Sequence, residues 1–158
     1  MAVFTKINIK DISQIENQFN LGKIKIFKGI KKGIENTNYL LQTKKNKYIL
    51  TIFEKRIHGG CKSKDLPFFM NLMSKLSKLK IKCPEPIKNK NGKFIFKLKN
   101  KNACIVTFLR GQDKKQLNAN DCFTVGKNIA KLHKVSAKIK LFRKNSFSVQ
   151  SWPKMLNK

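Results

Sequence analysis

Two glycines and two asparagines near the N-terminus have the types and spacing that suit phosphate binding. Gly29 and Gly33 come first, and Asn36 and Asn38 follow closely. Backbone N–H groups cradle a phosphate only where the chain comes very near it, and glycine removes the side chain that would prevent this approach. The asparagines add neutral donors. The same Gly-x-x-x-Gly spacing also suits an ordinary hairpin turn, so its place between two strands decides between the interpretations.

Two other groups of residues resemble sites less closely. His58 and Cys61 have a ligand-like gap, but two ligands in a glycine loop do not complete a metal site. The segment 60–63 lacks the glycine that stands directly before the lysine in a phosphate loop. His133, within Lys-Leu-His-Lys, is interpreted as a packed or surface residue rather than an acid–base group. No metal site is predicted in this chain.

Alternating apolar and polar residues surround the glycines and predict the elements that must hold them. An amphipathic segment that Asp65 can cap predicts a helix to Leu79, and Cys83-Pro-Glu-Pro86 ends any continuation. The predicted strands are Ile24–Gly29, Ile34–Thr43, Tyr48–Glu54, Lys93–Leu98 and Asn102–Leu109. The sequence therefore predicts an α+β domain with a five-stranded antiparallel sheet and a helix.

Helical spacing also appears on both sides of this region. Asp11 is predicted to cap a short helix through Phe19, and Asn118 or Asn120 a longer one. One side of the longer helix carries Cys122, Val125, Ile129, Leu132 and His133. Beyond Ser136 the apolar residues Phe142, Phe147, Trp152 and Leu156 have no evident partners. We expect the sequence to stop inside a second lobe.

The charge of the chain has two explanations. The 158 residues include 36 Lys plus Arg and 8 Asp plus Glu, for a net charge of +28, and 41% are hydrophobic, which excludes general disorder. A basic surface suggests nucleic-acid binding. However, only Arg56, Arg110 and Arg143 are Arg, and Lys, Asn and Ile are all abundant. Because these three share A/T-rich codons, a composition bias explains the excess, and no specific nucleic-acid partner is predicted.

The compartment is predicted from what the sequence lacks. No apolar run approaches the roughly 20 residues that span a bilayer, and the N-terminus has no compact apolar signal region. Cys61, Cys83, Cys104 and Cys122 form no Cys-x-x-Cys pair, which favours reduced thiols over zinc or disulfides. We expect a cytoplasmic protein without a membrane contact.

Several collinear segments resemble bacterial homoserine kinases of the aminoglycoside-phosphotransferase-like superfamily. They are Met1-Ala-Val-Phe-Thr5, Gly33-Ile-Glu-Asn-Thr-Asn-Tyr39, Tyr48-Ile-Leu-Thr-Ile-Phe-Glu-Lys-Arg56, Asp65-Leu-Pro-Phe-Phe69, Cys83-Pro-x-Pro86, Val106-Thr-Phe-Leu109 and Leu132-His133. The resemblance implies a protein-kinase-like small lobe at 1–109 that binds the nucleotide. The residues 110–158 would then be the connector and the helical start of a truncated large lobe.

The resemblance also implies site residues and cofactors. ATP would lie against Gly29, Gly33, Asn36, Asn38, Ile49 and Thr51, with adenine against the backbone of Thr107, Phe108 and Leu109. Val106 is a further apolar candidate. Thr51 stands where protein kinases have a lysine that contacts the phosphates. Lys55 or Lys47 is a candidate to replace that lysine, whereas Glu54 is interpreted as a solvent-facing partner of a neighbouring Lys.

The catalytic aspartate and the Mg²⁺ ligands of this superfamily have no counterpart before Lys158, because the last acidic residue is Asp121. The leading hypothesis is thus an N-terminal part of an ATP-dependent homoserine kinase of threonine biosynthesis, with Mg²⁺ ligands outside this chain and no activity alone. The alternatives are a kinase for another small-molecule hydroxyl and a basic nucleic-acid-binding protein.

Overall fold

The computed structural model describes residues 3–54, 63–145 and 148–153. The helices are α1 (Ile9–Gln18), α2 (Leu66–Lys78) and α3 (Ala119–Ser136), with short 3-10 turns at Ser63–Asp65 and Val149–Ser151. The strands are β1 (Ile24–Gly29), β2 (Thr37–Thr43), β3 (Lys47–Ile52), β4 (Ile95–Leu98) and β5 (Lys101–Thr107). The predicted order of three strands, a helix and two strands is confirmed.

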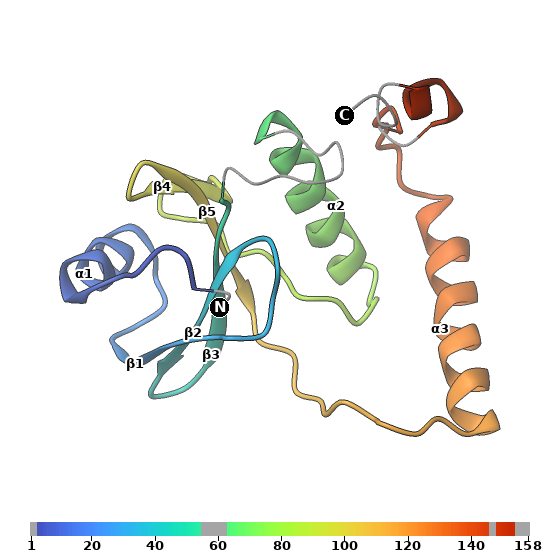
Figure 1. Cartoon of the computed structure of the whole chain (residues 1–158), viewed down its shortest axis with the longest axis horizontal. Coiled ribbons are helices and arrows are strands. Elements are labelled where there is room, and N and C mark those ends of the chain that lie inside the picture. Colours follow the sequence, from blue (N-terminus) through green and yellow to red (C-terminus); the bar gives the residue numbers. More distant parts are fainter. Residues whose placement is uncertain (1–2, 55–62, 146–147, 154–158) are drawn as a thin grey trace.

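The five strands form one antiparallel sheet in the order β1-β2-β3-β5-β4 (Figure 1). Across the sheet, Lys28 pairs with Leu40, Leu40 with Ile49, and Ile49 with Val106. The β4–β5 turn uses Lys99 and Asn100, whose φ angles of 48° and 60° suit a tight hairpin. Paired residues point to the same side, so this register decides which side chains share a face.

The helix α1 covers one face of the sheet, called here the α1 face (Figure 1). Ile15 of α1 and Phe19, which directly follows the helix, belong to one buried cluster with Leu41, Leu50 and Ile105 of the sheet. The ring of Phe19 meets that of Phe96 edge to face at 5.0 Å. This cluster is the main core of the described chain.

The helix α2 packs on the opposite face, called here the α2 face, as predicted. Met70 of α2 is buried with Cys104 and Val106 of β5, and Ile49 lies partly buried against them. The cover does not extend to β1, where Ile26 is 50% exposed. The α2 face is therefore closed over β5 and open over β1 and β2.

Local contacts change two of the predicted boundaries and one predicted capping bond. Asn8, rather than Asp11, caps α1: the Asp11 N–H donates to the Asn8 side chain at 3.1 Å, and the Asn8 N–H donates back to the Asp11 carboxylate at 2.8 Å. Asp65 stands at the N-cap of α2, but its side chain makes no capping bond. The second strand begins at Thr37, because Ile34 lies in the preceding loop and is 88% exposed.

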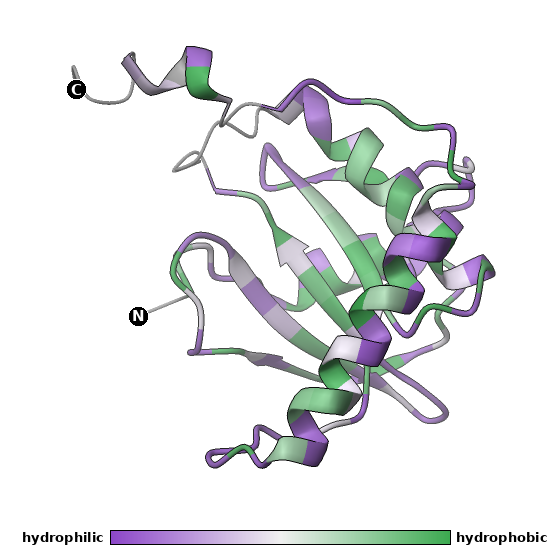
Figure 2. Cartoon of the chain, turned by 90° about the vertical axis from the view of Figure 1, so that its right-hand side faces the viewer, coloured by the Kyte–Doolittle hydropathy of each residue, from purple (hydrophilic) through white to green (hydrophobic). Residues whose placement is uncertain are grey.

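The helix α3 begins after Asn118, one of its two predicted caps, and stands beside α2 rather than on the sheet (Figures 1 and 2). It has no buried residue, and Phe123, Val125 and Ile129 are exposed. Phe142 and Trp152 are also exposed, as expected, whereas Phe147 lies outside the described residues. None of the helices that the described residues form is long and apolar enough to cross a membrane.

After α3 the chain returns to the start of α2. The Arg143 guanidinium donates to the Asp65 carboxylate at 2.9 Å and lies 5.3 Å from the centre of the Phe69 ring. The Lys131 ammonium donates to the Lys80 carbonyl at 3.2 Å. These contacts join the segment after the sheet to both ends of α2.

Candidate functional site

Three of the predicted site residues lie together on the α2 face. Asn38 of β2 pairs with Thr51 of β3, Ile49 lies two residues before Thr51, and all three are half-buried. The Thr51 hydroxyl donates to the Asn38 side-chain oxygen at 2.7 Å. Thr51 thus fills its position with a neutral, hydrogen-bonded group and supplies no charge.

The loop between β1 and β2 lies at one end of this face. Gly33 is exposed and has a φ of 144°, a conformation that L side chains rarely adopt. At position 29, packing rather than backbone conformation favours glycine, because a Cβ there would lie 2.9 Å from a methyl carbon of Val3. Its contact with phosphate stays a prediction.

Asn36 joins the loop to the end of β3. Its side-chain oxygen accepts the Glu54 N–H at 3.2 Å, which leaves its amide nitrogen as a donor among the described residues. Asn38, in contrast, directs its amide nitrogen to the Asn36 carbonyl at 3.5 Å. Both N–H groups of the Asn36 amide are therefore without an acceptor among the described residues, whereas Asn38 has one of its two engaged.

The connector after β5 lies at the other end of the sheet. The Thr107 N–H donates to the Glu85 carbonyl, and the Phe108 N–H to the Lys47 carbonyl, at 2.9 and 3.2 Å. The Leu109 N–H has no partner within the part of the chain that the structure describes. Of the three predicted connector amides, only that of Leu109 remains to face an adenine edge.

A cavity of about 830 Å³ lies between the β2–β3 turn and this connector. It is lined by Gln42, Thr43, Lys44, Lys45, Asn46, Lys47, Tyr48, Ile87, Thr107, Phe108, Arg110, Gly111 and Gln112. The cavity includes Thr107 and Phe108 but not Asn38, Ile49 or Thr51. The predicted residues thus line an open sheet face with a polar loop at one end and a connector at the other, not one closed pocket.

The open face also includes apolar residues that the sequence reasoning missed. Ile26 and Leu40 lie on the α2 face because their strand neighbours Phe27 and Leu41 belong to the α1-face cluster. Together with Ile49 they form an apolar floor that a flat ring can contact. Val106 is only 8% exposed and packs with Met70, so it belongs to the core. The alternation in β1 was the signal that would have identified Ile26.

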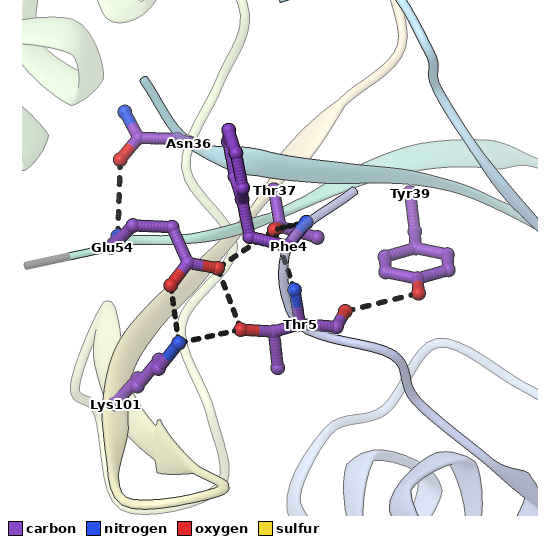
Figure 3. A network of polar contacts seen from close by, with 7 residues as sticks. All are labelled: Phe4, Thr5, Asn36, Thr37, Tyr39, Glu54 and Lys101. Carbon is purple, nitrogen blue, oxygen red and sulfur yellow. Dashed lines mark hydrogen bonds and ion pairs between the residues drawn. The ribbon is translucent and has the colours of Figure 1, made fainter. Parts of the chain in front are cut away.

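Glu54 is buried in a polar network, so its interpretation as a solvent-facing residue is wrong (Figure 3). Its carboxylate accepts the hydroxyls of Thr5 and Thr37 at 2.6 and 2.7 Å and pairs with Lys101. The Lys101 ammonium also donates to the Thr5 hydroxyl at 2.7 Å. Four segments meet in this network: the N-terminus, the start of β2, and the ends of β3 and β5 that lie beside the loop.

Burial raises the pKa of Glu54, but the hydrogen bonds from Lys101, Thr5 and Thr37 and the charge of Lys101 together bring that pKa below its usual value. A carboxyl whose pKa is lower in the folded than in the unfolded chain stabilises the folded chain. This stabilisation is complete at pH values above the pKa of the carboxyl in the unfolded chain, about 4.3. This contribution is lost as the pH falls through the folded pKa.

We therefore expect Glu54→Gln to be less stable than the unmodified chain at neutral pH, with the difference shrinking below about pH 4.3. Urea unfolding followed by circular dichroism, repeated at several pH values, measures both stabilities. Other carboxyls are the same in both proteins and cancel in the comparison. A difference that stayed constant down to about pH 3 would contradict this assignment of the shift.

Four further carboxylates are committed to structural contacts. Asp11, Glu16, Asp113 and Asp121 pair with Lys99, Lys23, Lys32 and Lys114 at 2.6 to 3.4 Å. Among the described residues, no three His, Cys, Asp or Glu side chains come close enough together to hold a metal ion. The described chain therefore does not fit a bound Mg²⁺ by itself. Lys55, His58 and Cys61 lie outside the described residues.

Comparison with solved structures gives the fold. A spectinomycin phosphotransferase in complex with ADP and spectinomycin aligns with 97% of this chain and 46% of its own, at a TM-score of 0.64 and 14% identity. A microcompartment-associated aminopropanol kinase aligns with 89% of this chain and 45% of its own, at a TM-score of 0.65 and 14% identity. The sheet and its helices therefore form the kinase-like small-lobe fold that the sequence predicted.

Sequence comparison gives the family. The homoserine kinase of Methylocella silvestris is 36% identical over 155 residues, which are 98% of this chain and 47% of that protein. The homoserine kinase of Bradyrhizobium diazoefficiens is 38% identical over 152 residues, 96% of this chain and 45% of that protein. The chain thus spans about half the length of these curated relatives. Since the model of the phosphotransferase enzyme family matches residues 26–157, the chain belongs to that family.

Proposed function

We propose that this chain is the nucleotide-binding part of an ATP-dependent homoserine kinase. The observation that carries the proposal is the identity of 36–38% to homoserine kinases over nearly the whole chain. The solved kinases with other acceptors are only 14% identical, so they support no other acceptor. Residues 1–109 would be the nucleotide lobe, and 110–158 the connector and the start of the second lobe.

The open α2 face supports a nucleotide that lies along β3. Tyr48 pairs with Thr107, the last residue of β5 before the connector. Tyr48 and Thr51 are three residues apart, or about 10 Å along the strand. Adenine would lie between the apolar floor and the Leu109 N–H. The phosphates would then extend toward Asn36 and Gly33. Bound ATP would supply the γ-phosphoryl group, and this chain would orient it.

The helix α3 supports the assignment of a second lobe. Its exposed Cys122, Val125 and Ile129, which are spaced by three and four residues, form an uncovered apolar side. The remaining half of the relatives' length would cover this side and supply the base, the Mg²⁺ ligands and the homoserine site.

A chimera tests this function. In it, the chain replaces the segment with which it aligns in the Bradyrhizobium diazoefficiens homoserine kinase. We expect homoserine phosphorylation within about a hundredfold of that enzyme, since small misplacements cost up to this factor. Within the chimera, Asn36→Leu should raise the KM for ATP about 3- to 10-fold, the value of a neutral hydrogen bond, without changing the KM for homoserine.

The matched control is Asn91→Leu, which alters an exposed asparagine in the turn before β4. It should leave both KM values unchanged. A folded chimera without ATP-dependent turnover would contradict the proposed function. An Asn36 variant that raised only the KM for homoserine would contradict the placement of the nucleotide.

A further inference from the structure

One positive charge on the open α2 face has no partner in the described chain. Lys28 lies on β1 and pairs with Leu40, whose neighbour Leu41 faces α1, so Lys28 and Leu40 share the α2 face. The Lys28 side chain is exposed, and no hydrogen bond or ion pair joins it to another described residue. Six of the eight acidic side chains are paired with other lysines or with Arg143.

Lys28 lies where its side chain can supply the positive charge that Thr51 lacks. Lys28 directly precedes Gly29, where β1 ends and the polar loop begins. On the same face of the sheet, the Asn38–Thr51 pair is the next pair along the strands from the row that contains Lys28. Ile49 lies two strands away from Lys28, or about 10 Å at the usual strand spacing. The four-carbon stem of a lysine can lie on the apolar floor while its ammonium extends toward the loop.

The other lysine candidate on this face lies at the wrong end. Lys47 shares the α2 face with Ile49 and Thr51, but its carbonyl accepts the Phe108 N–H of the connector. It is four residues from Thr51, or about 13 Å along β3. Lys47 would therefore lie beside adenine, away from the phosphates.

We propose that Lys28 binds the phosphates of the nucleotide and supplies the charge that Thr51 does not. The inference rests on the proposed function, because it assumes a nucleotide on the α2 face. It moves the phosphate-binding lysine from the third strand to the first, at the entrance of the glycine loop. The stem of Lys28 would also extend the apolar floor beside Ile26.

Displacement of a fluorescent ADP analogue from the full chain tests this proposal. The competitors are ADP and adenosine, at about 0.15 M salt to screen non-specific attraction to a basic protein. Lys28→Met should weaken ADP about tenfold, the value of a hydrogen bond to a charged group, and leave adenosine within about twofold. Lys28→Arg should restore most of the ADP affinity. Lys47→Met, on the same face at the connector end, is the matched control and should not change the preference for ADP over adenosine.

The outcomes separate the two proposals. Failure of the unmodified chain to bind ADP or adenosine would overturn the proposed function and this inference with it. Binding of ADP that Lys28→Met leaves unchanged would overturn only the role of Lys28. So would a tenfold loss of ADP affinity in Lys47→Met or Lys55→Met with none in Lys28→Met.

Discussion

Replacing Lys101 with methionine is expected to lower the free energy of unfolding of this chain by about 3 kcal/mol. The Glu54 side chain is 7% exposed and that of Lys101 32%, so the carboxylate is the more deeply buried partner. Methionine keeps the apolar stem but removes the ammonium. One Glu54 oxygen would still accept the hydroxyls of Thr5 and Thr37, but the other would lose its bond to the Lys101 ammonium. A buried carboxylate without its counter-ion is the main cost.

Chemical denaturation of two further variants checks this explanation. Lys97→Met changes an exposed lysine of β4 and should shift stability by no more than about 0.5 kcal/mol. Combining Lys101→Met with Glu54→Gln should recover much of the loss, because no unpaired charge is left. If Lys101→Met were as stable as Lys97→Met, the pair would not compensate the burial of Glu54.

The purified chain alone is expected to phosphorylate homoserine at least about a thousandfold more slowly than ordinary kinases, which turn over at roughly 1–100 s⁻¹. Phosphoryl transfer needs metal ions that offset the charge on the transferring oxygens, and a base that accepts the hydroxyl proton. In the described chain, six of the eight carboxyls are already paired with Lys or Arg, and no metal-binding cluster exists.

An assay that couples ADP release to a colour change, with ATP, Mg²⁺ and homoserine, measures this rate. The active chimera described above is the positive control for the assay. Nucleotide binding by the same sample shows that the chain is folded. Turnover at ordinary kinase rates, abolished by replacing a carboxyl of this chain, would show that the catalytic groups do lie within it.

The fold was predictable where the information is local. The strand Ile24–Gly29 has the predicted bounds, since alternation and a closing glycine mark both ends. The cap of α1 was not predictable, because Asn8 and Asp11 are both good capping residues. Their reciprocal hydrogen bonds form only when the first turn of the helix has formed. Ile34 suited a strand by type, but the loop holds it away from the sheet.

The site was less predictable because its contacts are distant in sequence. Glu54 is buried by Thr5 and Lys101, each nearly fifty positions away, and no local pattern predicts such a meeting. The sequence predicted the connector as a segment, and its contact with adenine stays a prediction. However, which of its amides stay free depends on Glu85 and Lys47, which take those of Thr107 and Phe108. The role of Lys28 likewise depends on strand register, which the sequence alone did not specify.

The family match begins at residue 26, yet much of the core on the α1 face precedes it. The buried residues before that point are Ile7, Ile12, Ile15, Phe19, Leu21 and Ile24. A gene cut at the family boundary would encode a sheet with one bare apolar face and a Glu54 without its Thr5 hydroxyl. Such a product would be recovered mainly as aggregate. Residues 3–25 are therefore part of the folding unit, and a library or expression design should keep them.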